Sequence, residues 1–110
     1  MANTFKRFVE RSIGTSLTAV GSYSVSSGTQ VTVIGLTISN TSSASVDVDA
    51  TLYDGANDTY IVKTAPVPAG GTLVIVGGEQ KVVLEPGDGV RVKSSASGSC
   101  DSVLSLLEIS

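Results

Sequence analysis

Several residue types on which enzymes and metalloproteins depend are absent or scarce in this sequence. The 110-residue chain has no histidine, no tryptophan and one cysteine. The lack of histidine removes the usual general base near neutral pH, the Ser–His and Cys–His nucleophile pairs and the commonest zinc ligand. One cysteine can build neither an intrachain disulfide nor a thiolate zinc site. Neither a phosphate-binding glycine motif nor a Gly-x-Ser-x-Gly elbow occurs. We therefore predict a protein without enzymatic activity, cofactor or metal.

Charge is also scarce. Charged residues make up 15% of the chain and the net charge is −3, against about 25% charged residues in an average domain. A negative chain is poorly suited to neutralising phosphates, so we expect no direct contact with nucleic acid. No apolar run approaches the ~18 residues that a membrane-spanning helix needs, and the N-terminal cations are not followed by a signal-peptide pattern. We expect no membrane association. The lone cysteine fits synthesis in a reducing compartment.

Four aspartates, Asp47, Asp49, Asp54 and Asp58, lie close together in the sequence and are the only cluster that suggests a cation site. Their spacing does not match an EF-hand loop, and the distal bidentate glutamate is missing. Asp47 and Asp49 are two residues apart in a predicted strand, so their side chains point to the same face, which we expect to be solvated. Glycoside hydrolysis by paired carboxylates is disfavoured because the chain has few aromatic residues for a sugar cleft. We predict solvated carboxylates rather than a calcium site.

The clearest structural pattern lies between Gln30 and Tyr53, where two apolar runs are joined by a polar connection at 40–45. Apolar residues occupy every second position of each run, as in strands with one buried face; they are Val31, Val33, Leu36 and Ile38, then Val46, Val48, Ala50 and Leu52. The apolar phase slips by one at Ile34–Gly35, which predicts a β-bulge. We interpret the two runs as the central antiparallel pair, a hairpin, of a β-sandwich.

Short strand patterns and turn signals alternate along the rest of the chain. We expect further strands at 17–25, 59–64, 72–76, 81–84, 90–93 and 102–109, with turns at 26–28, 54–58, 77–79 and 85–89 and a polar loop at 94–101. The proline-rich segment 66–71 should lie outside the sheets. This spacing is typical of an all-β fold. The prediction is an antiparallel β-sandwich, with jelly-roll and immunoglobulin-like topologies both open.

The N-terminal segment combines three cations with two of the five aromatic residues. We predict an extended arm over residues 1–16 and a β-sandwich domain over 17–110. Aromatic anchors of this kind often dock on a neighbour, so the expected partner-binding residues are Phe5, Lys6, Arg7, Phe8 and Arg11. Deleting residues 1–11 should then leave the sandwich folded. Cys100 is either an inert side chain near the last strand or the site of an intermolecular disulfide.

The sequence resembles a family of small virion structural proteins of tailed bacteriophages. The segments that carry the resemblance are VIGLTISNT (33–41), YIVKTAPVPAGG (60–71), GGEQKVVLEPGD (77–88) and SVLSLLEI (102–109). They consist mainly of strand and turn residues, and the likeness extends over nearly the whole chain from about residue 11. The resemblance implies an all-β sandwich without catalytic activity, present in many copies in the virion and assembled in the cytoplasm of the bacterial host.

Two positions in the virion are compatible with this resemblance. The first is a neck or collar protein at the head–tail junction, for which the basic, aromatic N-terminal segment is suited because it could dock on a ring of neighbours. The second is a decoration protein that cements the capsid. The partners would be portal or adaptor, tail or capsid proteins, together with further copies of this chain. A small carbohydrate- or protein-binding β-module is the non-viral alternative.

Overall fold

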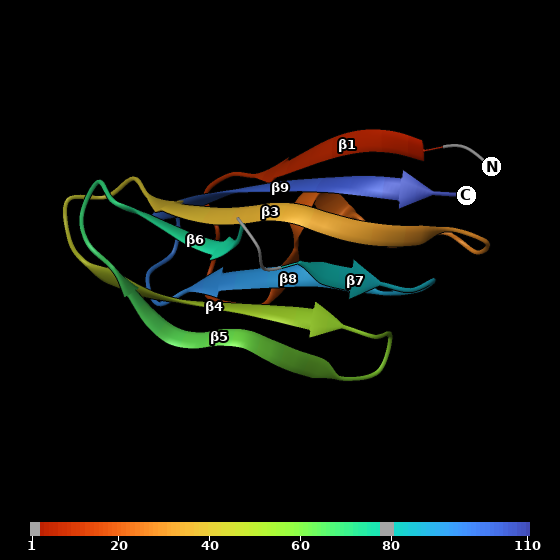
Figure 1. The fold of residues 1–110 in the computed structure, drawn as a ribbon. Helices are drawn as coiled ribbons and strands as arrows, with labels where there is room; N and C mark the ends of the chain where they lie inside the picture. Colours follow the sequence, from red (N-terminus) through yellow and green to blue (C-terminus); the bar gives the residue numbers. More distant parts are fainter. Residues whose placement is uncertain (1–2, 78–80) are drawn as a thin grey trace.

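The computed structural model describes residues 3–77 and 81–110, which form two packed antiparallel sheets (Figure 1). The larger sheet has the order β1-β9-β3-β6, with β7 also paired to β3, and the smaller has the order β2-β8-β4-β5. The strands are β1 (Asn3–Glu10), β2 (Thr18–Ala19), β3 (Gln30–Asn40), β4 (Val46–Tyr53), β5 (Asp58–Val67), β6 (Thr72–Val76), β7 (Val82–Leu84), β8 (Gly89–Ser94) and β9 (Cys100–Ile109), and η1 (Val20–Ser22) is a short 3₁₀ helix. The predicted all-β sandwich is confirmed.

The strand order identifies the topology. If the short β7 is set aside, consecutive strands lie in different sheets except for β4 and β5, and the first and last long strands, β1 and β9, lie side by side. This is the double Greek-key order of a jelly roll. Of the two topologies left open by the sequence, the jelly roll is therefore present.

The predicted hairpin between Gln30 and Tyr53 is wrong, because β3 and β4 lie in different sheets. The connection at 41–45 crosses from one sheet to the other and is organised by the buried side chain of Asn40. Its Nδ2 donates to the carbonyls of Ala44 at 2.7 Å and Val67 at 3.0 Å, while its Oδ1 accepts the Ser42 N–H at 2.9 Å. An alternation pattern shows which face of a strand is buried, but not which strand is its neighbour.

Other local predictions have mixed outcomes. The bulge near Ile34–Gly35 is confirmed, since the β3–β9 register shifts between Val33 and Gly35. The strand expected over 17–25 shrinks to β2 and is followed by η1, where Gly21 has a positive φ of 62°. β5 continues through Pro66, which is tolerated because β5 is an edge strand. The turn at 77–79 lies partly outside the described residues.

The N-terminal segment also differs from the prediction. Residues 3–10 have the expected extended backbone, but they form β1, which pairs with β9 along its whole length instead of projecting from the sandwich. Ile13 then enters the core, and its N–H donates to the Cys100 carbonyl at 2.8 Å. The reason is that β9 would otherwise be an unpaired edge. The segment predicted as an arm thus contributes a strand to the larger sheet.

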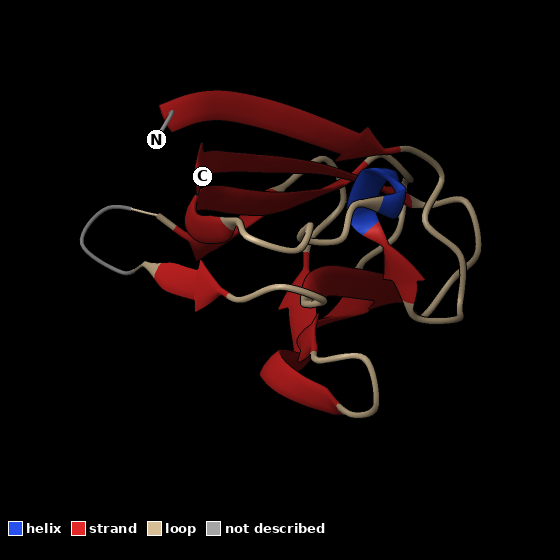
Figure 2. Cartoon of the chain, turned by 90° about the vertical axis from the view of Figure 1, so that its right-hand side faces the viewer, coloured by secondary structure: helices blue, strands red, loops and turns tan. Residues whose placement is uncertain are grey.

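The core fills the space between the sheets with aliphatic side chains. The largest that are fully buried are Ile13, Leu36, Ile38, Leu84, Leu104 and Leu106, with Val20, Val31, Val33, Val48, Val67 and Val76. Figure 2 shows η1 beside the two layers, and it contacts β1, β8 and β9. Valine and leucine at alternate strand positions account for this interior, so side-chain burial on the inner faces supplies most of the folding free energy.

Candidate interaction surface

The five predicted partner-binding residues do not form one patch, because β1 points successive side chains to opposite faces. Phe5 and Arg7 are exposed on the outer face of the larger sheet, and the Phe5 side chain is 75% exposed. Lys6 and Phe8 point toward the interior side, where Phe8 stacks on Tyr23 with ring centroids 4.4 Å apart. Arg11 is exposed just after β1 ends. Phe8 is therefore a packing residue, while Phe5, Lys6, Arg7 and Arg11 are exposed.

The outer face of the larger sheet is the main exposed apolar surface. Five of the six most exposed large apolar side chains among the described residues lie on it, namely Phe5, Val9, Val74, Val83 and Val103. The strand registers arrange them in two rows across the sheet: Phe5, Leu107, Thr32 and Val83 in one, and Val9, Val103, Thr37 and Val74 in the other. Contiguous apolar patches on a soluble chain mark interaction sites.

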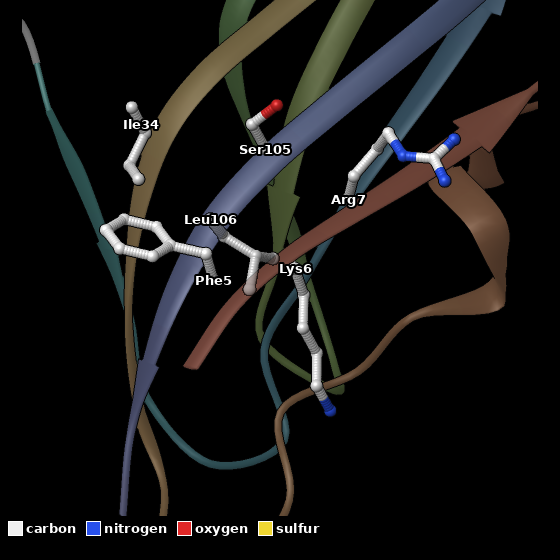
Figure 3. A pocket seen from close by; sticks show the side chains of 6 residues that line it. All are labelled: Phe5, Lys6, Arg7, Ile34, Ser105 and Leu106. Atoms are coloured by element: carbon white, nitrogen blue, oxygen red, sulfur yellow. The ribbon is translucent and has the colours of Figure 1, made fainter. Parts of the chain in front are cut away.

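A shallow depression of about 430 Å³ lies on this sheet near its β1 edge (Figure 3). Phe5 and Ile34 lie on one side of it and Arg7 on the other, with Ser105 between them. Ser105 pairs with Gly35, so two small residues occupy the strip between the apolar rows. The outer face therefore has two rows that carry apolar side chains, with Ser105 and Gly35 between them and Arg7 at the β1 end of that strip.

The outer face of the smaller sheet has the opposite character, because its charges are paired with one another. Lys93 Nζ lies 3.5 Å from Asp49 Oδ2, and Arg91 Nη1 lies 3.4 Å from Asp58 Oδ2. The Arg91 guanidinium also stacks on the Tyr53 ring, with its Cζ 3.5 Å from the ring centroid. Lys93 and Asp49 face each other on the neighbouring strands β8 and β4, whereas Arg91 on β8 reaches Asp58 on β5 across the intervening β4. The charges of Asp49, Asp58, Arg91 and Lys93 are thus paired within the chain.

One polar cluster joins β1, β9 and the segment after η1. The Tyr23 hydroxyl donates to Glu108 Oε2 at 2.6 Å, and Lys6 Nζ lies 3.0 Å from Glu108 Oε1. The hydrogen bond from Tyr23 is the main cause that lowers the pKa of Glu108, and Lys6 adds to it. Burial, followed by the bond to Glu108, raises the pKa of Tyr23 above its usual range. The cluster is accounted for by its role in fixing β1 to the sandwich.

The clustered aspartates have structural partners. Asp49 Oδ1 accepts the Thr64 N–H at 2.6 Å, and Asp58 Oδ1 accepts the Thr51 hydroxyl at 2.8 Å. Asp54 accepts the N–H groups of Asn57 and Ala56 within its own turn, and these bonds lower its pKa. Asp47 is exposed next to an open depression that is also lined by Asp49 and Lys93. Among residues 3–77 and 81–110, no group of three or more acidic or cysteine side chains is placed to hold a metal ion.

Cys100 is fully buried at the start of β9, and its Sγ lies 3.7 Å from the Ser94 Oγ. A disulfide to another copy would require this residue to leave the core, so of the two alternatives that the sequence left open, burial favours the inert side chain. In the part of the chain that the structure describes, no helix is long and apolar enough to cross a membrane.

Sequence reasoning missed the apolar outer face, although a signal for it is present. Leu73–Val76, Val82–Leu84 and Val103–Leu107 are runs in which apolar residues occupy both parities, apart from Ser105. A strand in a two-layer sandwich needs only one apolar face. Apolar residues at the outward-facing positions as well therefore indicate that the outer face of the sheet is also apolar and needs to be covered.

The sequence matches no known protein family and no curated protein. Among solved structures, the chain is similar to one in the "Acidic stable capsid structure of Helicobacter pylori bacteriophage KHP30", with a TM-score of 0.56 and 8% sequence identity. The match covers 100% of this chain and 94% of that chain. At this identity the likeness establishes a shared fold, and the two chains have nearly the same extent.

Proposed function

We propose that this protein is a non-enzymatic structural component of a bacteriophage virion. The observation that carries the proposal is the apolar outer face of the larger sheet, which a chain of this size would expose in isolation and cover in an assembly. The jelly-roll strand order is compatible with this role, because viral capsid proteins use it among other functions. The similarity to a chain in a phage capsid structure supports the same role.

Within the virion, a decoration protein on the capsid has the more specific support. The similar chain comes from a structure titled as a capsid, and the match covers almost all of it, so the comparison is with a small whole chain of similar size. The neck or collar position was predicted because residues 1–16 were expected to form a docking arm. In the structure residues 3–10 belong to the larger sheet, so that argument loses its basis. The neck remains the second candidate position.

Copy number in purified particles tests the role and separates the two positions. Quantitative mass spectrometry would compare this chain with the major capsid protein of the same virion. Hundreds of copies are expected for a decoration protein that covers the capsid lattice. On the order of ten or twenty copies would instead support a ring at the neck or tail. Absence from the particle would contradict the virion role and favour the small binding module.

A further inference from the structure

The larger sheet ends at an open edge formed by β1. This eight-residue strand pairs with β9 on one side and with no described strand on the other. Its register with β9 has no shift, and it contains neither glycine nor proline. Alternate residues of an antiparallel edge strand direct their N–H and C=O groups outward, where they can pair with an added strand. β1 is therefore a regular template for strand addition.

The other described edges lack this regularity. β5, the edge of the smaller sheet, contains Pro66, has a positive φ of 53° at Thr64 and shifts register twice against β4. On the far side of the larger sheet, β6 and β7 have five and three residues. The other edge of the smaller sheet, β2, has two. Proline, bulges and short strands are the usual means by which proteins prevent edge pairing. Among the described strands, only β1 presents a long regular edge.

We propose that β1 pairs antiparallel with β1 of a second copy of this chain across a two-fold axis, joining the two larger sheets. The second copy is the occupant because its own β1 is the one regular edge that it offers, and a single contact then covers both open edges. Such a contact is isologous and closes as a dimer. The inference deepens the proposed virion role by naming a partner. The pairing itself is a property of the purified chain and is tested there.

Charge limits the register of this pairing. Side chains that lie opposite each other across antiparallel strands point to the same face of the sheet. In a symmetric pair, the two-fold axis must therefore pass next to one residue of β1, which lies opposite the same residue of the second copy. An axis at Lys6 or at Arg7 would place that cation against itself. An axis at Val9 would place Arg7 against Arg11 of the other copy. An axis at Phe5 avoids like charges but brings no opposite charges together.

An axis at Phe8 gives a complementary register. It places Lys6 opposite Glu10 of the other copy, and this pair occurs twice. Lys6 Nζ also lies 3.0 Å from Glu108 Oε1. Glu10 Oε1 accepts the Gly21 N–H, which leaves Glu10 Oε2 for the pairing. It also places Arg7 opposite Val9 and the Phe8 residues opposite each other. Opposite charges at directly facing positions stabilise strand pairs, whereas like charges destabilise them. In this dimer the two apolar outer faces form one continuous surface, which a further virion partner would cover.

Sedimentation analysis of the purified chain over a range of concentrations tests the dimer. We expect a reversible monomer–dimer equilibrium. In Glu10→Lys, lysine faces Lys6 of the other copy, and the dimer dissociation constant should rise at least about tenfold. Glu10→Gln, which keeps an acceptor for the Gly21 N–H, should have a smaller effect. Glu85→Lys makes the same charge change in an exposed turn and should leave the equilibrium unchanged.

Cysteine cross-linking tests the register. Arg7→Cys and Val9→Cys both lie on the outer face, and the native Cys100 is buried. When the two variants carry different tags and are co-expressed, mild oxidation should give the mixed covalent dimer, while neither variant alone should cross-link. A wild-type chain that stays monomeric at millimolar concentration, or cross-linking by a single variant alone, would overturn the proposed pairing. Neither result would alter the copy number found in virions, so failure here is distinguishable from failure of the virion role.

Discussion

The outer faces of the two sheets have the same strand geometry but differ in the side chains that they expose. On the smaller sheet, Arg91 and Lys93 are paired with aspartates of other strands, and Arg91 also covers Tyr53. On the larger sheet, the corresponding positions carry exposed side chains such as Val74, Val83 and Val103, which have no such cover. Folding alone explains the first face, because its polar groups satisfy one another. For the second face we propose an assembly in which a partner covers it.

The largest expected effect comes from deleting residues 1–11, which removes β1 from the larger sheet. The deletion exposes the β9 edge, breaks the Lys6–Glu108 ion pair and removes the stacking of Phe8 on Tyr23. At about 1 kcal/mol per ladder hydrogen bond, we expect a loss on the order of 5 kcal/mol in the free energy of unfolding, measured by urea denaturation. Phe5→Ala is the control and should change stability little. An unchanged denaturation midpoint in the deletion would show that β1 is dispensable for folding.

The next contrast compares the two faces of the larger sheet directly. Leu104→Ala, on the inner face of β9, should lower the free energy of unfolding by about 2–5 kcal/mol because it leaves a cavity in the core. Val103→Thr, one residue earlier on the outer face, should cost less than about 1 kcal/mol. Chemical denaturation of both variants measures the difference. Similar losses in the two would mean that the outer face is needed for folding rather than for binding.

A smaller effect is expected from the charged face. Arg91→Ala removes the ion pair with Asp58 and the stacking on Tyr53, both partly exposed. The expected loss is about 1–2 kcal/mol by thermal denaturation, since exposed ion pairs and cation–π contacts each contribute modestly. Arg91→Lys should retain part of this stability. A neutral effect of Arg91→Ala would contradict the view that the contacts of Arg91 within the chain stabilise this face.

The smallest effect concerns pH. The folded pKa of Glu108 is lowered from its ordinary 4.5, so the stability that it contributes is present above that pH and is lost as the pH falls through the folded pKa. The pKa of Tyr23 is raised, so its contribution is present below the ordinary 10.0 and is lost as the pH rises above it. Tyr23→Phe should reduce the acid-side loss by about 0.5 kcal/mol, measured by denaturation at several pH values. An identical acid-side slope in wild type and variant would exclude this coupling.

The sequence predicted what depends on local pattern and missed what depends on long-range pairing. The alternation of apolar and polar residues identified β3 and β4 and the bulge beside Gly35, because a strand with one buried face has apolar side chains at every second position. It could not show that these strands lie in different sheets, because that choice depends on the loop contacts of Asn40 and on distant strands such as β9. The sequence signal for the apolar outer face was the presence of apolar residues at both the inward-facing and the outward-facing positions of β6, β7 and β9.

The N-terminal segment illustrates the same limit for the candidate site. Its aromatic and basic residues were singled out correctly as unusual, and Phe5 and Arg7 are exposed. Their assignment to an arm failed because the pairing of residues 3–10 with β9 joins segments at opposite ends of the chain. Composition alone could not show that Phe8 packs inside the sandwich while Phe5 is exposed. Only the strand parity, once β1 is known to be a strand, assigns one ring to the interior and the other to the surface.

The central claim is that an assembly covers the outer face of the larger sheet. Covalent footprinting of the isolated chain and of intact virions would compare labelling at Val74 and Val83, each 62% exposed, with labelling at Tyr60, which lies on the smaller sheet and is 43% exposed. The account predicts that Val74 and Val83 become protected in the particle while Tyr60 keeps its reactivity. Equal labelling of the two valines in both states, or protection confined to Tyr60, would contradict it.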